Sequence, residues 1–152
     1  MLKLSETLDI RPFDNSVMGG RLKELFRGSG EFTSKLGAIE QMTCHTLLPD
    51  RIGGNHYHEN KYEIIAHLFG NPITVYLKEP KTGEFHRADI EAGKKFDLIP
   101  EIAHALYCPS GEAHILEITN LKFDPENPKR DLFSYEVVTL KEAKQAVYQL
   151  SA

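Results

Sequence analysis

The 152-residue chain has no tryptophan, only two cysteines, and no long apolar segment. Cys44 and Cys108 are too few for a disulfide framework, and unpaired cysteines are typical of the reducing cytoplasm. No segment approaches the roughly 20 apolar residues that span a membrane. The first residues also lack the apolar core of a signal peptide. We therefore expect a cytoplasmic protein that has no membrane partner.

Positive charge is also scarce, because 18 Lys and Arg residues face 22 Asp and Glu residues, for a formal net charge of −4. No basic run or stripe is present, so a nucleic acid is not an expected partner. Hydrophobic residues make up 41% of the chain, which is enough to bury a core. At this length, one domain spanning residues 1–152 is expected.

Short apolar runs alternate with turn residues about every ten positions, which is typical of an all-β protein. Thr139 and Glu142 form a capping box that predicts a helix ending near Leu150. Many strands followed by one terminal helix favour an antiparallel β-barrel, closed or made of two sheets. The predicted strands are residues 22–26, 36–48, 57–69 (including a turn), 73–77, 84–90, 95–99, 103–108, 113–118 and 133–138.

The residues most informative about function are two histidines one residue apart, followed by a carboxylate. His56 and His58 would point to the same side of a strand, because side chains at i and i+2 share a face. They can therefore bind one metal ion together. Glu63, on the next strand, can complete the coordination, and a buried carboxylate needs such a partner. The pattern predicts a divalent metal site.

This segment resembles the first motif of the cupin superfamily. The spacing His56-x-His58-x4-Glu63-x6-Gly70 matches the core of that motif, although Asp50 stands where the family has its leading glycine. A second family motif is similar to a segment of this chain through Gly93, Pro100 and His104. Each gap differs by one residue, the internal glycine is missing, and Cys108 stands where the family has asparagine.

The resemblance implies an antiparallel jelly-roll barrel over about residues 34–120. Residues 1–33 would form an N-terminal arm, and residues 132–150 a C-terminal strand and helix. It also implies a metal held by His56, His58, Glu63 and His104. His104 has an alternative role as a core histidine. Three imidazoles and one carboxylate suit zinc, iron, nickel, manganese or copper, without selecting among them.

The segment from Gly54 to His58, with Lys61 and Glu63, looks like cupins that act on nucleotide-linked sugars in polysaccharide biosynthesis. We therefore expect a metal-dependent epimerase or isomerase whose substrate is a keto-sugar or nucleotide sugar. A metal-dependent dioxygenase is an alternative, because the same ligands suit iron with open positions. A non-catalytic cupin that binds a small molecule is another.

Proton transfer in such an epimerase or isomerase needs residues other than the metal ligands. His67 lies four residues after Glu63 and should share its interior face, so it is a candidate general base, or else a packed wall histidine. Tyr107 is the candidate donor on the opposite face of the substrate. His45 faces away from Cys44 and Thr46, but the sequence does not tell which face is the interior. A solvated surface role is expected for Lys61.

A homodimer is expected, because exposed edge strands invite pairing between subunits. The strand from about Arg21 to Phe26 is the candidate for the paired or exchanged edge. Cys108 shares the parity of His104 and should therefore face inward, most simply as a small buried hydrophobe.

Overall fold

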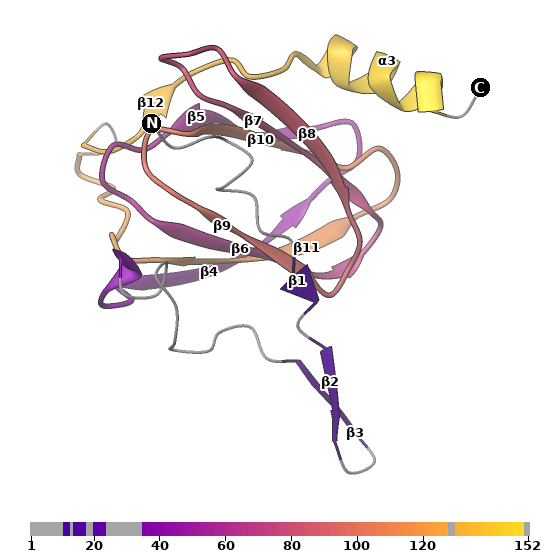
Figure 1. Cartoon of the computed structure of the whole chain (residues 1–152), viewed down its shortest axis with the longest axis horizontal. Helices are drawn as coiled ribbons and strands as arrows, with labels where there is room; N and C mark the ends of the chain where they lie inside the picture. Colours follow the sequence, from indigo (N-terminus) through magenta and orange to yellow (C-terminus); the bar gives the residue numbers. More distant parts are fainter. Residues whose placement is uncertain (1–10, 13, 18–19, 24–34, 128–129, 151–152) are drawn as a thin grey trace.

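Two antiparallel sheets of five strands each lie face to face in the computed structural model (Figure 1). The model describes residues 11–12, 14–17, 20–23, 35–127 and 130–150, with side chains described only within 35–127 and 130–146. The first sheet has the order β1-β9-β6-β11-β4 and the second the order β12-β5-β10-β7-β8. A hairpin of β2 (Asp14–Val17) and β3 (Gly20–Lys23) extends away from both sheets.

The strands of the first sheet are β1 (Arg11–Pro12), β9 (Lys94–Leu98), β6 (Glu63–Gly70), β11 (Ala113–Thr119) and β4 (Gln41–Leu47). Those of the second are β12 (Phe133–Ser134), β5 (Ile52–Tyr57), β10 (Ala103–Tyr107), β7 (Ile73–Lys78) and β8 (Phe85–Ile90). Neighbouring strands are mostly not consecutive in the sequence, so the chain passes repeatedly from one sheet to the other. This is the jelly-roll arrangement.

The prediction of an all-β fold with a C-terminal helix is confirmed, and five of the predicted strands agree with the structure within one residue. These are 73–77, 84–90, 95–99, 103–108 and 113–118, seen as β7 to β11. Of the two expected forms, closed or made of two sheets, the described residues have the two-sheet form, because no backbone pairing joins the two sheets. The predicted strand at 22–26 is described only as far as Lys23, so its proposed part in a dimer lies mostly outside the described residues.

The segment 57–69 contains a turn and a strand, as expected, and the strand β6 begins at Glu63. Two other predicted strands were wrong in their bounds. The segment 36–48 becomes a strand only at Gln41, and the last strand ends at Ser134. β5 was missed because Gly53 and Gly54 are normally strand breakers, yet here they pair with Leu106 and Ala105 of β10.

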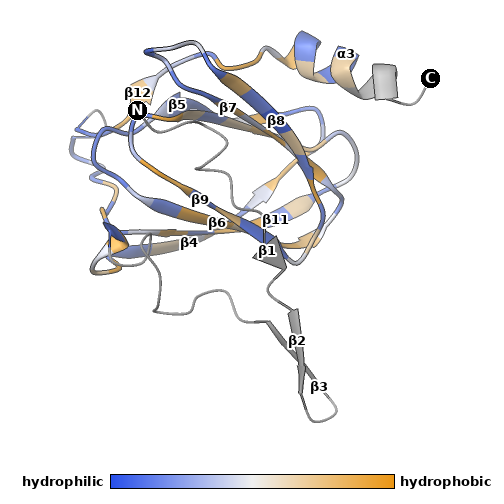
Figure 2. Ribbon diagram, in the orientation of Figure 1, coloured by the Kyte–Doolittle hydropathy of each residue, from blue (hydrophilic) through white to orange (hydrophobic). Residues whose placement is uncertain are grey.

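The main core fills the space between the sheets, and Figure 2 shows hydrophobic positions recurring along the strands of both. Alternation along each strand sends every second side chain into this space. The largest cluster of buried apolar residues is Leu47, Ile65, Ile73, Val75, Leu77, Ile90, Phe96, Leu98, Ile102, Leu106, Cys108, Ala113 and Ile115. Burying each large aliphatic side chain contributes about 1.5–3 kcal/mol, so this layer holds the two sheets together.

The helix α3 (Leu140–Leu150) begins with the predicted capping box. The Thr139 backbone N–H donates to Glu142 Oε2 at 2.8 Å, and the Glu142 backbone N–H donates to Thr139 Oγ1 at 3.2 Å. Ala143 is fully buried in a cluster with Tyr107 on the outer face of the second sheet. The start of the helix therefore packs on its own sheet.

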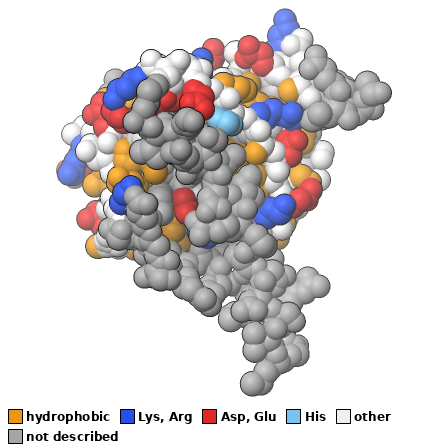
Figure 3. Space-filling model, viewed as in Figure 1, with side chains coloured by type: hydrophobic (Ala, Val, Ile, Leu, Met, Phe, Trp, Pro, Cys, Tyr) orange, Lys and Arg blue, Asp and Glu red, His pale blue; other side chains and the backbone are white. Residues whose placement is uncertain are grey.

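On the face of the molecule in Figure 3, described side chains of both charges lie among hydrophobic ones. In the described part of the chain, no helix combines the length and apolar character that crossing a membrane requires.

Two glycines allow neighbouring backbones to approach closely. Gly54 has φ +91°, and a Cβ there would lie 2.6 Å from the backbone carbonyl oxygen of His104. Gly70, the last residue of the first motif, has φ +108°, and its Cβ would collide with the Glu112 carbonyl. A side chain at either position would push neighbouring strands apart, so these glycines are needed for β5–β10 and β6–β11 contact.

Gly54→Ala should therefore destabilise the protein more than Gly83→Ala. Both glycines have positive φ, but a Cβ at Gly83 meets nothing within 4 Å. Gly83→Ala should cost about 1–2 kcal/mol for the backbone conformation alone. Gly54→Ala should cost about 1–3 kcal/mol more because of the collision with His104. Urea unfolding of the two variants measures the difference, and equal losses would contradict this account.

Candidate active site

Three of the four predicted ligands lie on strands, and the fourth follows directly after a strand. His56 lies on β5, His58 follows just after that strand, Glu63 begins β6, and His104 lies on β10. His56 and His104 are paired in the β5–β10 register, which brings the two halves of the sequence pattern together. The structure thus gathers all four residues at one end of the space between the sheets.

The imidazole rings are in contact, and the carboxylate lies between two of them. The His56 ring centroid is 4.6 Å from that of His104 and 4.9 Å from that of His58. Glu63 Oε1 lies 3.6 Å from His58 Nε2, and Glu63 Oε2 lies 3.8 Å from His104 Nε2. Glu63 Oε2 is buried without a hydrogen-bond partner.

Burial keeps the three imidazoles in their neutral form. It lowers the pKa of His58 to about 4, with the charge of Lys61 as the next cause. Burial also lowers the pKa of His56, partly offset by a hydrogen bond to the Gly54 carbonyl. The pKa of His104 falls well below its usual value through burial and the neighbouring imidazoles. Neutral imidazole is the form that binds metal ions.

Glu63 has the opposite shift, for the same reason. Burial raises its pKa well above the usual value, and the carboxyl group of Glu117 raises it further. Lys61 lowers it, since Lys61 Nζ lies 3.6 Å from Glu63 Oε1 and 3.8 Å from Glu117 Oε1. Removal of Glu63 from water is therefore only partly compensated by protein groups, and a bound cation would stabilise its charged form.

Asp131 fixes the orientation of His58 from the loop before β12. The His58 Nδ1–H donates to the backbone carbonyl of Asp131, which leaves Nε2 toward Glu63. The Asp131 carboxylate accepts hydrogen bonds from the backbone N–H groups of Glu59 at 3.1 Å and Asn60 at 2.9 Å. Such a partner on the far nitrogen sets the tautomer of a metal-binding histidine.

A cavity of about 330 Å³ opens beside the ligands. Its polar lining comes from both sheets: His56 and His104 from the second, and His45 and Glu117 from the first. Apolar side chains such as Leu106 and Ile115 complete the wall. The volume lies at the lower end of the range of about 300–1,000 Å³ for small-molecule sites.

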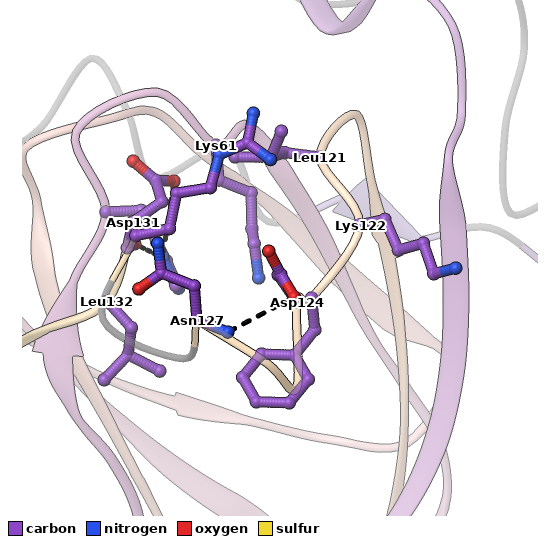
Figure 4. A pocket seen from close by; sticks show the side chains of 10 residues that line it. Lys61, Leu121, Lys122, Asp124, Asn127, Asp131 and Leu132 are labelled. Carbon is purple, nitrogen blue, oxygen red and sulfur yellow. Dashed lines mark hydrogen bonds and ion pairs between the residues drawn. The ribbon is translucent and has the colours of Figure 1, made fainter.

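A second, smaller cavity lies next to His58 and Lys61 (Figure 4). Its volume of about 20 Å³ is room for one water molecule. Figure 4 shows the side chains of Lys61, Leu121, Asp124, Asn127 and Asp131 around it. Residues of the loop that follows β11 therefore line this cavity together with Lys61.

The donor chemistry of the four residues fits a divalent metal, although their atoms do not yet converge on one point. Among the described residues, no three His, Cys, Asp or Glu side chains are placed to hold one ion as they stand. In a tetrahedral site with bonds of about 2.1 Å, neighbouring donors lie about 3.4 Å apart. The separations of 3.6 and 3.8 Å run from two different oxygens of Glu63, to His58 Nε2 and His104 Nε2, so they are not the spacing around one shared donor. The fit to a metal therefore rests on the kinds of donor present and on Glu63 Oε2, which is buried without a hydrogen-bond partner.

The structure does not bring Tyr107 to the cavity. Side chains of β10 alternate, and since His104 and Leu106 line the cavity, Tyr107 lies on the outer face, beneath α3. Its hydroxyl donates to Asp50 Oδ1 at 3.5 Å. This position is incompatible with the expected role as a proton donor to a substrate in the cavity.

His67 faces the interior, as expected, but is not among the residues that line the cavity. Its Nδ1–H donates to the Ile90 carbonyl at 3.2 Å, and burial lowers its pKa. Its Nε2 is buried without a hydrogen-bond partner. This placement fits the packed wall histidine better than the general base.

Three residues near the site were missed or misjudged from the sequence. Lys61 was expected at the surface, but it is only 8% exposed. Lys61 lies in the loop before β6, so no strand periodicity marks it as buried. Glu117 and Asp131 carry no motif, and only the pairing of distant strands and loops brings them here. Cys108 is buried, as expected, and its Sγ–H donates to the Ser110 carbonyl.

Acid should destabilise the metal-free protein through these histidines. The unfolded state binds a proton at His58 near pH 6.5 and the folded state only near pH 4, so the contribution is complete above pH 6.5 and lost toward pH 4. For His58 alone the loss is about 3 kcal/mol. His56 and His104 act in the same direction, and Glu63, whose pKa is raised, opposes them.

His58→Asn isolates this effect, because the amide nitrogen can take the place of Nδ1 toward Asp131. Urea unfolding of metal-free protein between pH 7.5 and pH 4 should show a smaller acid loss in the variant than in the wild type. The same pH dependence in both proteins would contradict the assignment.

Solved structures share this fold at low sequence identity. The QdtA 3,4-ketoisomerase from Thermoanaerobacterium thermosaccharolyticum, as a mutant in complex with TDP-4-keto-6-deoxyglucose, is similar with a TM-score of 0.66 and 14% identity, covering 91% of this chain and 95% of that one. The dTDP-6-deoxy-D-glucose-3,5-epimerase RmlC from Legionella pneumophila has a TM-score of 0.68 and 17% identity, covering 85% and 72%. No protein-family model matches the sequence, and no curated protein matches it.

The capsular polysaccharide assembling protein CapF from Staphylococcus aureus is similar over a shorter region. The TM-score is 0.58 at 20% identity, and the match covers 64% of this chain. The match covers only 28% of CapF, so this chain corresponds to about a quarter of that protein. Identities this low establish the fold alone. The chain therefore shares the RmlC-like jelly-roll fold of these solved structures.

Proposed function

We propose that the chain is a metal-dependent enzyme that epimerises or isomerises a keto-sugar linked to a nucleotide. The observation that carries this proposal is the meeting of His56, His58, Glu63 and His104 beside a cavity of about 330 Å³. A cavity of this size suits one sugar ring, with a nucleotide extending outside it. A metal ion, a homodimer and a cytoplasmic location stay predictions.

The named solved structures support the substrate class. QdtA is a 3,4-ketoisomerase seen with TDP-4-keto-6-deoxyglucose, and RmlC is an epimerase seen with dTDP-4-keto-L-rhamnose. A third structure with the same fold is ChmJ, a 3'-monoepimerase from Streptomyces bikiniensis in complex with dTDP. Fold and function are separable, so this support is an analogy, which the chemistry of the site must carry further.

Epimerisation and isomerisation begin with the same step. A C–H bond beside the carbonyl breaks, the proton passes to a base, and the electron pair moves to the carbonyl oxygen to give an enolate. For epimerisation, the proton returns to the same carbon from the other face. For isomerisation, the proton goes to the former carbonyl carbon, while the proton of the neighbouring hydroxyl group moves to the former carbonyl oxygen. A bound divalent metal would supply a Lewis acid that stabilises the negative charge on that oxygen.

The residues of the chain prepare the site for this charge. His56, His58 and His104 are neutral and lie around Glu63, so the protein part of the ligand set carries at most one negative charge. Asp131 and Gly54 hold the far sides of two rings through their backbone carbonyls. Apolar lining residues exclude water, which strengthens electrostatic interactions inside the cavity.

The metal is tested by measuring the metal content of protein purified without added metal or chelator. We expect close to one equivalent in the wild type and loss of most of it in His56→Ala, because one of four ligands is removed. His114→Ala is the matched control, because His114 stacks on exposed Phe69 outside the site. If wild-type protein and His56→Ala are both folded and both contain no metal, the metal site is contradicted.

The reaction is tested with dTDP-4-keto-6-deoxyglucose in deuterated water. Metal-loaded wild-type protein should exchange the hydrogen beside the keto group for deuterium, as followed by NMR, and the chelated protein should lose the exchange. No exchange by metal-loaded protein would argue against the proposed reaction. Oxygen uptake after iron loading would instead favour the dioxygenase, and ligand binding without exchange would favour a binding protein.

A further inference from the structure

Glu117 lines the cavity but is not one of the four candidate metal ligands. It lies on β11, paired with Ile65 of β6 on one side and Thr43 of β4 on the other. Its neighbour two residues along, Thr119, pairs with Glu63, so Glu117 and Glu63 point to the same inner face. Among the described residues that line the cavity, Glu117 is the one acidic side chain.

Lys61 holds the Glu117 carboxylate in position. Lys61 Nζ lies 3.8 Å from Glu117 Oε1 and 3.6 Å from Glu63 Oε1, so one buried ammonium group joins the two carboxyl groups. The Glu63 side chain is 2% exposed, whereas that of Glu117 is 25% exposed. Of the joined pair, Glu117 is therefore the carboxyl group that a ligand in the cavity can reach.

The surroundings of Glu117 point to a ligand beyond the protein. Glu63, which shares the ammonium group with it, has its Oε2 buried without a hydrogen-bond partner on the side of His104. The cavity lined by Glu117 also reaches His104 and His56 on the facing sheet. A molecule bound between the sheets can therefore contact the proposed metal ligands and Glu117 together.

Charge decides what kind of group Glu117 would bind. The ammonium group of Lys61 already lies 3.8 Å from Glu117 Oε1, so a cationic ligand group at Glu117 would be repelled by that positive charge. An anionic ligand group would be repelled, because the carboxyl groups of both Glu63 and Glu117 lie there. A neutral hydroxyl is the donor that suits the remaining acceptor oxygen, because charge-assisted hydrogen bonds to carboxylates are the stronger ones.

We propose that Glu117, positioned by Lys61, accepts a hydrogen bond from a substrate hydroxyl group next to the carbonyl. The site then selects α-hydroxyketones over simple ketones. The placing of the carbonyl at the proposed metal ligands rests on the function proposed above, but the hydroxyl contact can be tested without turnover.

The test compares two ring ketones of sugar size that carry no nucleotide, 2-hydroxycyclohexanone and cyclohexanone. NMR titration gives the Kd of each for the protein as purified. In the wild type, loss of the ligand hydroxyl should weaken binding about 10- to 100-fold, as expected for a hydrogen bond to a charged group. Glu117→Leu should bind the two ketones within about threefold, because its side chain has no acceptor.

Glu112→Leu is the matched control, because Glu112 is exposed just before β11 and does not line the cavity. It should keep the wild-type preference. If Glu117→Leu does not fold, Glu117→Gln decides: its neutral oxygen should reduce the preference several-fold, and an unchanged preference overturns the inference.

The two proposals fail in different ways. A wild-type protein without preference for the hydroxyketone, or a Glu117→Leu variant that keeps the preference, overturns the role of Glu117 whatever the enzyme does with nucleotide sugars. A preference that depends on Glu117, in a protein that shows no exchange on dTDP-4-keto-6-deoxyglucose, retains the hydroxyl site and removes the proposed function.

Discussion

Burial of the Glu63 carboxyl group is the constraint on which the rest of the site depends. A carboxylate taken out of water is costly unless partners compensate it. Here Lys61 compensates part of the cost, while Glu117 and burial act against ionisation. The same burial keeps three imidazoles neutral around it. The result is a set of neutral nitrogen donors and one undercompensated oxygen donor, which is an environment suited to a cation.

The two sheets serve this arrangement in different ways. The second sheet brings His56 and His104 into register, which is possible because Gly54 lets β5 approach the β10 backbone. The first sheet supplies Glu63 on β6 and Glu117 on the neighbouring strand β11, two residues from the partner of Glu63. The proposed metal ligands and the proposed hydroxyl acceptor thus lie on walls that face each other. A substrate held between them would be oriented by both.

Much of the fold and the grouping of three of the four candidate ligands could be predicted from the sequence because they depend on local spacing. Strands β7 to β11 follow from alternating apolar runs between turn residues, and the candidates His56, His58 and Glu63 lie within one eight-residue segment. The roles of Tyr107 and His67 were harder to predict. Tyr107 packs under α3 on the outer face, and His67 points inward but lies outside the cavity lining.

The sequence by itself determined the short strands, the capped C-terminal helix and the grouping of His56, His58 and Glu63, because each depends on residues a few positions apart. Tertiary structure alone decided that β5 forms in spite of two glycines, that Lys61 is buried, and that Asp131 orients His58 across more than seventy residues. It also placed Glu117 beside Glu63. These features depend on the pairing of strands and loops distant in the chain, and no local pattern records which distant segments will meet.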